Sequence, residues 1–89
     1  MPLYLIIEHF PPDPKPIYER FREKGRLAPQ GLAYVNSWVS SDLKTCYQIM
    51  ETADRRQLDE WMANWEDLVE FEVHPVITSA QAADKIASR

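Results

Sequence analysis

Apolar residues gather in segments whose spacing predicts four strands in this chain of 89 residues. Residues 3–10, LYLIIEHF, are apolar on both alternating faces over most of their length, which predicts a strand covered on both sides. Residues 31–39 and 44–51, GLAYVNSWV and KTCYQIME, flank a turn-forming Ser-Ser-Asp run and predict a hairpin. Residues 68–77 form the last strand, which alternates the apolar Val69, Phe71 and Val73 with the polar Glu70, Glu72 and His74.

Two helices are predicted between these strands. The first has Asp13 as its cap, Pro14 at its first position and Gly25 as its stop, with a short apolar stripe of Ile17, Tyr18 and Phe21. The second, over residues 54–66, has one apolar face at the spacing i, i+3, i+4, i+7, formed by Leu58, Trp61, Met62 and Trp65. The run Asp54-Arg-Arg-Gln57 matches a capping box at its start.

The predicted element order, β-α-β-β-α-β, is that of a ferredoxin-like α+β fold. We expect an antiparallel sheet in the order 4-1-3-2, formed by a domain of residues 1–77, with both helices on one face. Residues 78–89 form a C-terminal tail that a second capping box, Thr78-x-x-Gln81, predicts to be helical. Because the first strand is apolar on both faces, we expect a second copy of the chain to cover the other face of the sheet, which gives a homodimer.

Composition and charge remove several classes of function. The chain has a net charge of −4 and scattered basic residues, so we expect no nucleic-acid partner. Cys46 is the single cysteine, so no intramolecular disulfide can form. The N-terminus lacks the features of a signal peptide and its apolar run is too short for a bilayer, so we expect a cytoplasmic protein without membrane contact.

Two carboxylates are candidate catalytic residues. Glu8 has the same parity as Tyr4 and Ile6, so its side chain points where apolar groups point. Burial there would raise its pKa and suit it to general acid or base chemistry, whereas a wet strand end would leave it a plain surface group. Glu51, at the end of the third strand, is the second candidate, with the same alternative. His9 has the opposite parity from Glu8, so the two form no dyad.

Four aromatic residues are candidate ligand-binding groups: Trp38, Tyr47, Trp61 and Trp65. They could line a cavity between sheet and helices, for which a volume of about 300 Å³ is typical of ligand sites, or simply fill the core. Cys46 is expected to be a small buried apolar group. The basic run of Arg20, Arg22 and Arg26 could bind an anion, or be the solvated face of a helix.

No metal site is expected at Glu70, Glu72 and His74, because same-face residues along a strand lie about 7 Å apart. These three side chains are instead expected to form a polar face turned toward solvent or toward the second subunit.

Several motifs together resemble a known family: YLIIEHF, FREKGRLAPQGL, NSWV, CYQIME and W-x3-W-x-DLVEFEV-x-PV. Over about residues 3–80 the chain is similar to a family of small bacterial proteins of unknown function within the dimeric α+β barrel group. That group includes cofactor-free monooxygenases, small-ring isomerases, haem-degrading enzymes and binding or structural modules. The haem-degrading members have an iron-ligating His on a helix. Residues 54–66 contain no His, so the resemblance implies no haem, and no other cofactor is expected.

Three hypotheses about function follow. The first is a small-molecule-binding barrel subunit, with cofactor-free oxygenase or isomerase chemistry in which Glu8 or Glu51 is the base. The second is a structural or interaction module without catalytic activity. The third is a regulatory subunit that senses a small ligand. Fold alone does not choose among them.

Overall fold

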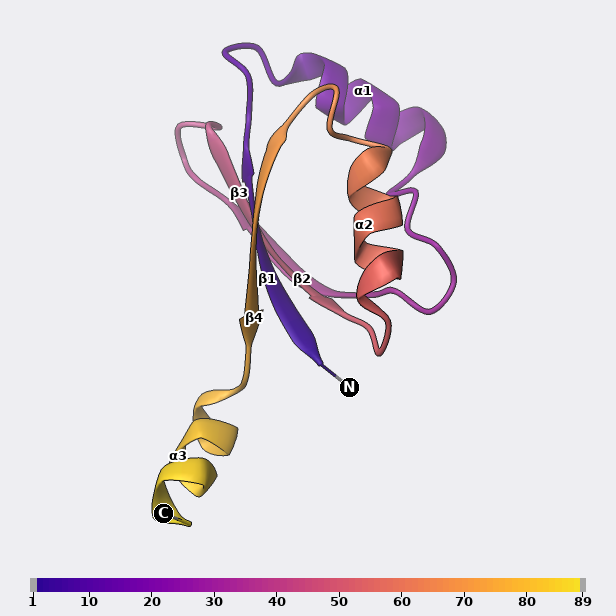
Figure 1. Cartoon of the computed structure of the whole chain (residues 1–89). Helices are drawn as coiled ribbons and strands as arrows, with labels where there is room; N and C mark the ends of the chain where they lie inside the picture. The colour runs from indigo at the N-terminus through magenta and orange to yellow at the C-terminus, as the bar shows by residue number, and fades with distance from the viewer. Residues whose placement is uncertain (1, 89) are drawn as a thin grey trace.

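The fold is described by a computed structural model in which residues 2–88 are placed (Figure 1). The elements in chain order are β1 (Leu3–His9), α1 (Lys15–Lys24), β2 (Ala33–Val39), β3 (Thr45–Glu51), α2 (Arg55–Ala63), β4 (Glu70–Val76) and α3 (Ser79–Ala87). The predicted order of strands and helices is confirmed, and the tail beyond the last strand is a helix, as predicted.

The four strands form one antiparallel sheet in the order β2-β3-β1-β4, which is the predicted order read from the other edge. Glu8 of β1 lies opposite Cys46 of β3 and Phe71 of β4. A β-bulge between Tyr34 and Asn36 adds one residue to β2 and reverses which face the following side chains meet. The ferredoxin-like α+β fold is consistent with this topology.

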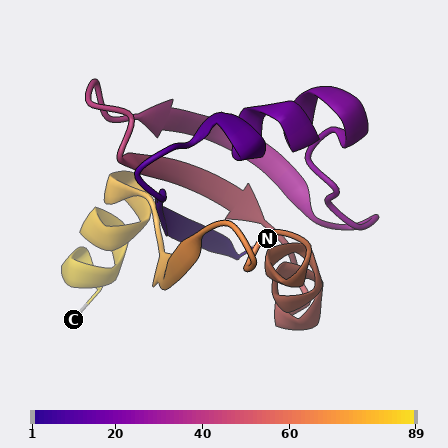
Figure 2. The ribbon, with the colours of Figure 1, turned by 90° about the horizontal axis from the view of Figure 1, so that it is seen from above.

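Helices α1 and α2 cover one face of the sheet, and the other face is open (Figure 2). The core lies under the helices and includes the fully buried Ile6, Met50 and Leu58, with Trp61 and Trp65 beside them. Helix α3 continues past the end of β4 on the open side of the sheet, away from α1 and α2 (Figure 1). No helix within residues 2–88 has the length and apolar character that a membrane crossing needs.

The start of α2 differs from its prediction in one respect. Asp54 caps the helix by accepting a hydrogen bond from the Arg56 backbone N–H, but Gln57 does not complete the capping box. Its amide instead bonds the Thr52 hydroxyl and the backbone oxygen of Gln30. A tertiary contact to the loop before β2 has therefore replaced the local one. The capping box at α3, between Thr78 and Gln81, is formed as predicted.

Gly31 makes this contact with Gln57 feasible. Its φ is +96°, a region that favours glycine, and a Cβ there would lie 2.4 Å from the amide nitrogen of Gln57. Gly25 ends α1 in the same way, with a φ of +71°. At the other end of α1, the N-cap is Pro14 and the helix begins at Lys15, so the prediction of Asp13 as cap and Pro14 as first helical residue is wrong by one position. The Asp13 carboxylate accepts a hydrogen bond from the Lys15 backbone N–H at 3.1 Å from just outside the helix.

The buried hydroxyl of Thr52 connects β3 to α2, and we predict that Thr52→Val destabilises the protein by about 1–3 kcal/mol. The hydroxyl accepts a hydrogen bond from the Asp54 backbone N–H at 3.0 Å and bonds the side chain of Gln57. An isosteric valine leaves both groups without that partner. Urea unfolding followed by circular dichroism measures the difference. Thr45→Val in β3 is the matched control, expected within about 0.5 kcal/mol of the wild type; equal effects of the two changes would contradict the assignment.

Candidate functional site

A cavity of about 210 Å³ lies between the covered face of the sheet and helices α1 and α2. It is smaller than the roughly 300 Å³ expected from typical ligand sites. An apolar cavity of about 150 Å³ is nevertheless large enough to hold benzene, so this one accepts a ligand of single-ring size. Its lining residues come from β1, β2, β3, α1, α2 and the segments that follow β1, α1 and α2. They are Glu8, Phe10, Ile17, Tyr18, Phe21, Arg26, Ser37, Val39, Cys46, Gln48, Trp61 and Trp65.

The backbone oxygen of Arg26 holds the cavity wall together. It accepts hydrogen bonds from both indole N–H groups of α2 and the turn that follows it, at 3.1 Å from Trp61 and 2.9 Å from Trp65. Next to it, the side-chain amide of Asn64 donates to the backbone oxygen of Leu27 at 3.2 Å. Leu27 has a φ of +62°, a left-handed conformation that a branched residue adopts only when its surroundings impose it. The loop between α1 and β2 is thereby fixed against α2.

The side chain of Arg26 is held at the cavity by aromatic rings and one hydrogen bond. Its guanidinium carbon lies 3.8 Å from the centre of the Tyr34 ring and 5.2 Å from that of Phe21. One guanidinium nitrogen donates to the side-chain oxygen of Gln48 at 3.0 Å. A permanent positive charge is thus placed beside a largely apolar cavity, stabilised by cation–π contacts.

Glu8 points into the same cavity from β1 and is only 7% exposed. Burial raises its pKa, and this effect exceeds the lowering caused by a hydrogen bond with the Cys46 thiol and by the charge of Arg26. The prediction from strand parity, that the Glu8 side chain points where apolar groups point, is therefore confirmed. A carboxyl group with a raised pKa beside a fixed cation is suited to taking up and releasing a proton.

Burial and the neighbouring groups of the cavity also raise the pKa values of Cys46 and Tyr18. Burial and the nearby charge of Glu8 raise the pKa of the Cys46 thiol to about 12, so it stays protonated and behaves as a buried apolar group. The pKa of Tyr18 is raised by burial and by the proximity of Cys46 and Glu8. Tyr18 belongs to α1, whereas Cys46 belongs to β3, so three elements bring titratable groups to one cavity.

The predicted ligand-binding residues separate into two pairs. Trp61 and Trp65 line the cavity with Glu8, but Trp38 and Tyr47 lie on the open face of the sheet, so the expectation of one cavity lined by all four is wrong. The bulge in β2 explains Trp38, because the extra residue reverses the alternation that would have placed it on the same face as Tyr34. Tyr47 has the opposite parity from its neighbour Cys46, which points to the cavity.

Glu51 lies far from Glu8 within the sheet. It stands opposite Leu3 and Ala33 at the other end of β3, and its parity places it on the open face. The two candidate catalytic carboxylates are therefore not brought together, and Glu51 does not line the cavity.

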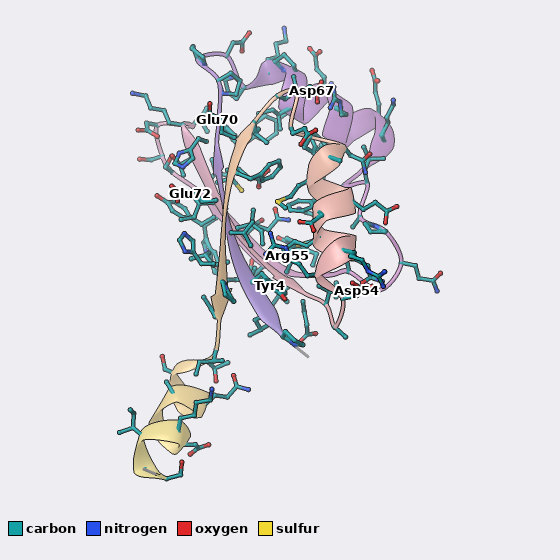
Figure 3. All side chains as sticks on the ribbon, viewed as in Figure 1. Tyr4, Asp54, Arg55, Asp67, Glu70 and Glu72 are labelled. Atoms are coloured by element: carbon teal, nitrogen blue, oxygen red, sulfur yellow. The ribbon has the colours of Figure 1, made fainter. Side chains whose placement is uncertain are left out.

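The polar residues of β4 lie on the open side of the sheet, where Figure 3 shows Glu70 and Glu72. Glu72 stands between two histidines, with 3.6 Å from one carboxylate oxygen to Nε2 of His9 and 3.6 Å from the other to Nε2 of His74. Within residues 2–88, no group of three or more His, Cys, Asp and Glu side chains has the geometry to hold a metal ion.

Arg26 and Tyr18 line the cavity, although the sequence predicts Tyr18 only as part of an apolar helix stripe and Arg26 only as one of three basic residues that could bind an anion. Arg26 was grouped with Arg20 and Arg22 as one basic run. The glycine before it was the available signal, because Gly25 ends the helix and removes Arg26 from the face that Arg22 occupies. Arg20 has a different partner, since it forms two hydrogen bonds of 2.8 Å with the Asp67 carboxylate.

We predict that Glu8→Gln stabilises the protein relative to the wild type as pH rises above the ordinary carboxyl range. The raised pKa of Glu8 means that the folded state keeps a proton that the unfolded chain releases above the ordinary value of 4.5. The free energy of unfolding of the wild type therefore falls between that pH and the folded pKa of Glu8, and the variant lacks this loss. Urea unfolding at pH 4 and pH 8 measures the difference, with Glu60→Gln on the exposed face of α2 as control. A stability gap that did not grow with pH would contradict the prediction.

Comparison with known proteins identifies a family and leaves the chemistry open. Neither curated proteins nor solved structures yield a match to this chain. A family model does match, and it covers residues 2–89, which is nearly the full length. This agrees with the resemblance to a family of unknown function that the motifs indicated. The chain belongs to the family described as Domain of unknown function (DUF3303).

Proposed function

We propose that this protein binds a small enolisable carbonyl compound in the cavity under α1 and α2, and that Glu8 is its general base. The observation that carries the proposal is a carboxyl group, 7% exposed, in a cavity that also contains a fixed guanidinium. Burying a carboxyl group under apolar surface costs stability, so its position calls for a role beyond folding. Its raised pKa brings it closer to the range in which a base works well near neutral pH.

The proposed chemistry needs no cofactor. The Glu8 carboxylate removes a proton from the carbon next to the carbonyl group, and the electron pair of the broken C–H bond moves to the carbonyl oxygen as an enolate. The positive charge of Arg26 stabilises the negative charge that develops. Where the compound has a C=C bond next to the carbon that loses the proton, the enolate is conjugated with it, and return of the proton from Glu8 to the far carbon of that bond completes an isomerisation. Addition of dioxygen to the enolate carbon, with the Glu8 proton passing to the resulting peroxide, is the oxygenase branch.

Two alternatives use the same residues differently. In a ligand-sensing subunit the cavity would bind the compound without proton transfer. In a structural module the aromatic side chains would only fill the core, and Glu8 would have no substrate. The raised pKa of Glu8 and the open volume beside it favour proton transfer over both alternatives. A direct test of proton transfer at carbon separates the three.

We predict that the protein catalyses exchange of C–H protons for deuterium in a compound that fits the cavity. A panel of single-ring ketones, keto acids and enolisable lactones in D₂O is followed by proton NMR, which requires no knowledge of the product. Glu8→Gln is expected to reduce the exchange rate by about 10²- to 10⁴-fold, the usual contribution of a positioned acid or base.

Glu60→Gln is the matched control for this experiment, because it makes the same change on an exposed side chain of α2. It should leave the exchange rate unchanged. Compounds that bind without exchanging protons would support the sensing alternative, and equal rates in the wild type and Glu8→Gln would remove Glu8 as the base.

We also propose that a second copy of the chain covers the open face of the sheet. An apolar band crosses that face from β2 to β1, in which Trp38 is 56% and Tyr47 40% exposed, with Ile49, Leu5 and Ile7 partly buried beside them. His9, Glu72 and His74 border the band on the β4 side. Helix α3 lies on the same side of the sheet, where it would meet the partner (Figure 1). A self-complementary apolar band with a polar border is the composition that a two-fold interface needs.

We predict that sedimentation equilibrium at micromolar concentration gives twice the chain mass of 10.4 kDa. Trp38→Glu places a charge on the most exposed side chain of the apolar band, at its β2 end. It should shift the equilibrium toward single chains by tenfold or more, by the roughly 1–3 kcal/mol that an interface residue of this kind contributes. Leu43→Glu introduces the same charge at the β2–β3 turn and serves as control. A wild-type mass near that of one chain would overturn the dimer.

A further inference from the structure

We propose that Arg26 is an anion-binding group and that the ligand of the cavity is a planar organic anion of single-ring size, carrying a carboxylate or enolate oxygen. This inference rests on the function proposed above and narrows its substrate class. Three observations lead to it: the state of the Arg26 guanidinium, the balance of charge in the cavity, and the aromatic character of the walls.

The guanidinium of Arg26 is held in place by its neighbours, but few of its N–H donors have a described hydrogen-bond partner. It carries five N–H donors, and the hydrogen bond described for it within residues 2–88 goes to the side-chain oxygen of Gln48. The rings of Tyr34 and Phe21 lie against the guanidinium, and its further donors remain on a group that lines the cavity. Arg20 is the useful contrast, because the Asp67 carboxylate already takes two of its donors in a bidentate contact. Arg26 has the same geometry to offer to a ligand.

The charge in the cavity calls for an anion once Glu8 has taken up the proton of the substrate. In that state of the proposed reaction the carboxyl group is neutral and the bound compound is the enolate, which a stable planar anion resembles. Arg26 and Glu8 are the charged side chains among its lining residues. With the Glu8 carboxyl neutral, one positive charge remains beside a largely apolar cavity that opens to solvent past Tyr18 and Phe21, and a single negative charge on the ligand balances it. A neutral carboxyl can in addition donate a hydrogen bond to that ligand, which an ionised one cannot.

The walls favour a flat ligand. Phe10 and Tyr18 meet edge to face with ring centres 6.2 Å apart, and the indoles of Trp61 and Trp65 are fixed by the Arg26 backbone oxygen. Rigid aromatic surfaces complement a planar ring and bind it with little loss of side-chain freedom. The volume of about 210 Å³ accommodates one ring with a carboxylate and not a fused system of several rings.

Binding of an anion should be coupled to the protonation of Glu8. The groups facing Glu8 are Cys46 from β3, Tyr18 from α1 and Arg26 from the loop before β2. An anion at Arg26 disfavours the ionised form of Glu8, so binding is accompanied by proton uptake and weakens as pH rises. Glu8→Gln cannot ionise and should bind the anion with an affinity that does not depend on this titration.

The three tryptophans provide a test that needs no knowledge of the natural ligand. Benzoate and benzamide have nearly the same shape and differ in charge. In a ¹H–¹⁵N correlation spectrum, addition of benzoate should shift the indole signals of Trp61 and Trp65, which line the cavity, and leave that of Trp38, on the opposite face, in place. We expect benzoate to bind at least tenfold more tightly than benzamide, the difference that one charge-assisted contact supplies.

Arg26→Gln tests the side chain without removing the backbone contact. Both indoles bond the backbone oxygen of residue 26, so indole signals at their wild-type positions show that the variant is folded. The variant should lose the preference for benzoate and retain the weaker binding of benzamide. Arg22→Gln, on the exposed face of α1, removes the same charge and should preserve the preference.

The possible results separate this inference from the proposed function. Benzamide binding as tightly as benzoate, or an unchanged preference in Arg26→Gln, would overturn the anion site and leave a cavity that binds neutral compounds. A shift of the Trp38 signal instead of the other two would place binding on the open face and overturn the inference. If neither compound shifted the signals of Trp61 and Trp65, the anion site and small-molecule binding in the cavity would both be refuted.

Discussion

The hydrogen bonds from two indoles to the backbone oxygen of Arg26 organise the helix-covered half of the molecule. Trp61 lies in α2 and Trp65 in the turn that follows it, and the acceptor that they share places the loop after α1 against this end of α2. The two side chains are 2% and 5% exposed, and burying each stabilises the fold by about 2–3 kcal/mol. Their N–H groups would be costly without a partner, and the Arg26 oxygen removes that cost. The left-handed Leu27 and the direction of the Arg26 side chain follow from this arrangement.

The cavity lies between the sheet and the helices, and the positions of Trp61 and Trp65 in its wall are fixed by their bonds to the Arg26 backbone oxygen. Burial of Glu8 disfavours its charged form and raises its pKa. The hydrogen bond with the Cys46 thiol and the nearby charge of Arg26 offset this rise only in part. Arg26 is anchored by Gln48 and by two rings, so the described contacts do not join it to Glu8 in a closed ion pair. A carboxyl group and a guanidinium that line one cavity without a described ion pair between them are poorly explained by stability alone. They are well explained by a ligand that uses both.

The sequence predicted the parts of this structure that depend on periodicity. The order of elements, the strand order and the apolar face with Trp61 and Trp65 all follow from alternation or from helical spacing. Glu8 was found for the same reason, because parity within a regular strand is reliable. Trp38 was misplaced because one extra residue at the β2 bulge reverses parity, and the run AYVNSWV contains no glycine or proline to mark it. The sequence places Arg26 with the helix residues because its hydrogen-bond partners, Gln48 and the indoles of Trp61 and Trp65, come from distant parts of the chain. Local sequence patterns do not indicate such contacts.

Strand β1 links the cavity to the proposed dimer. Its side chains alternate between Ile6 and Glu8 under the helices and Leu5 and Ile7 on the open face, so one strand serves both surfaces. A chain of 89 residues buries a smaller share of its surface than a larger domain does, and so has little stability in reserve. A carboxyl group buried near the end of its inner strand β1 lowers that stability further. Burial of the apolar band on the other face of β1 by a second copy of the chain would offset this loss of stability. In this view the second copy adds no residue to the cavity, and its contribution is to stabilise a strand that carries Glu8 into an apolar interior.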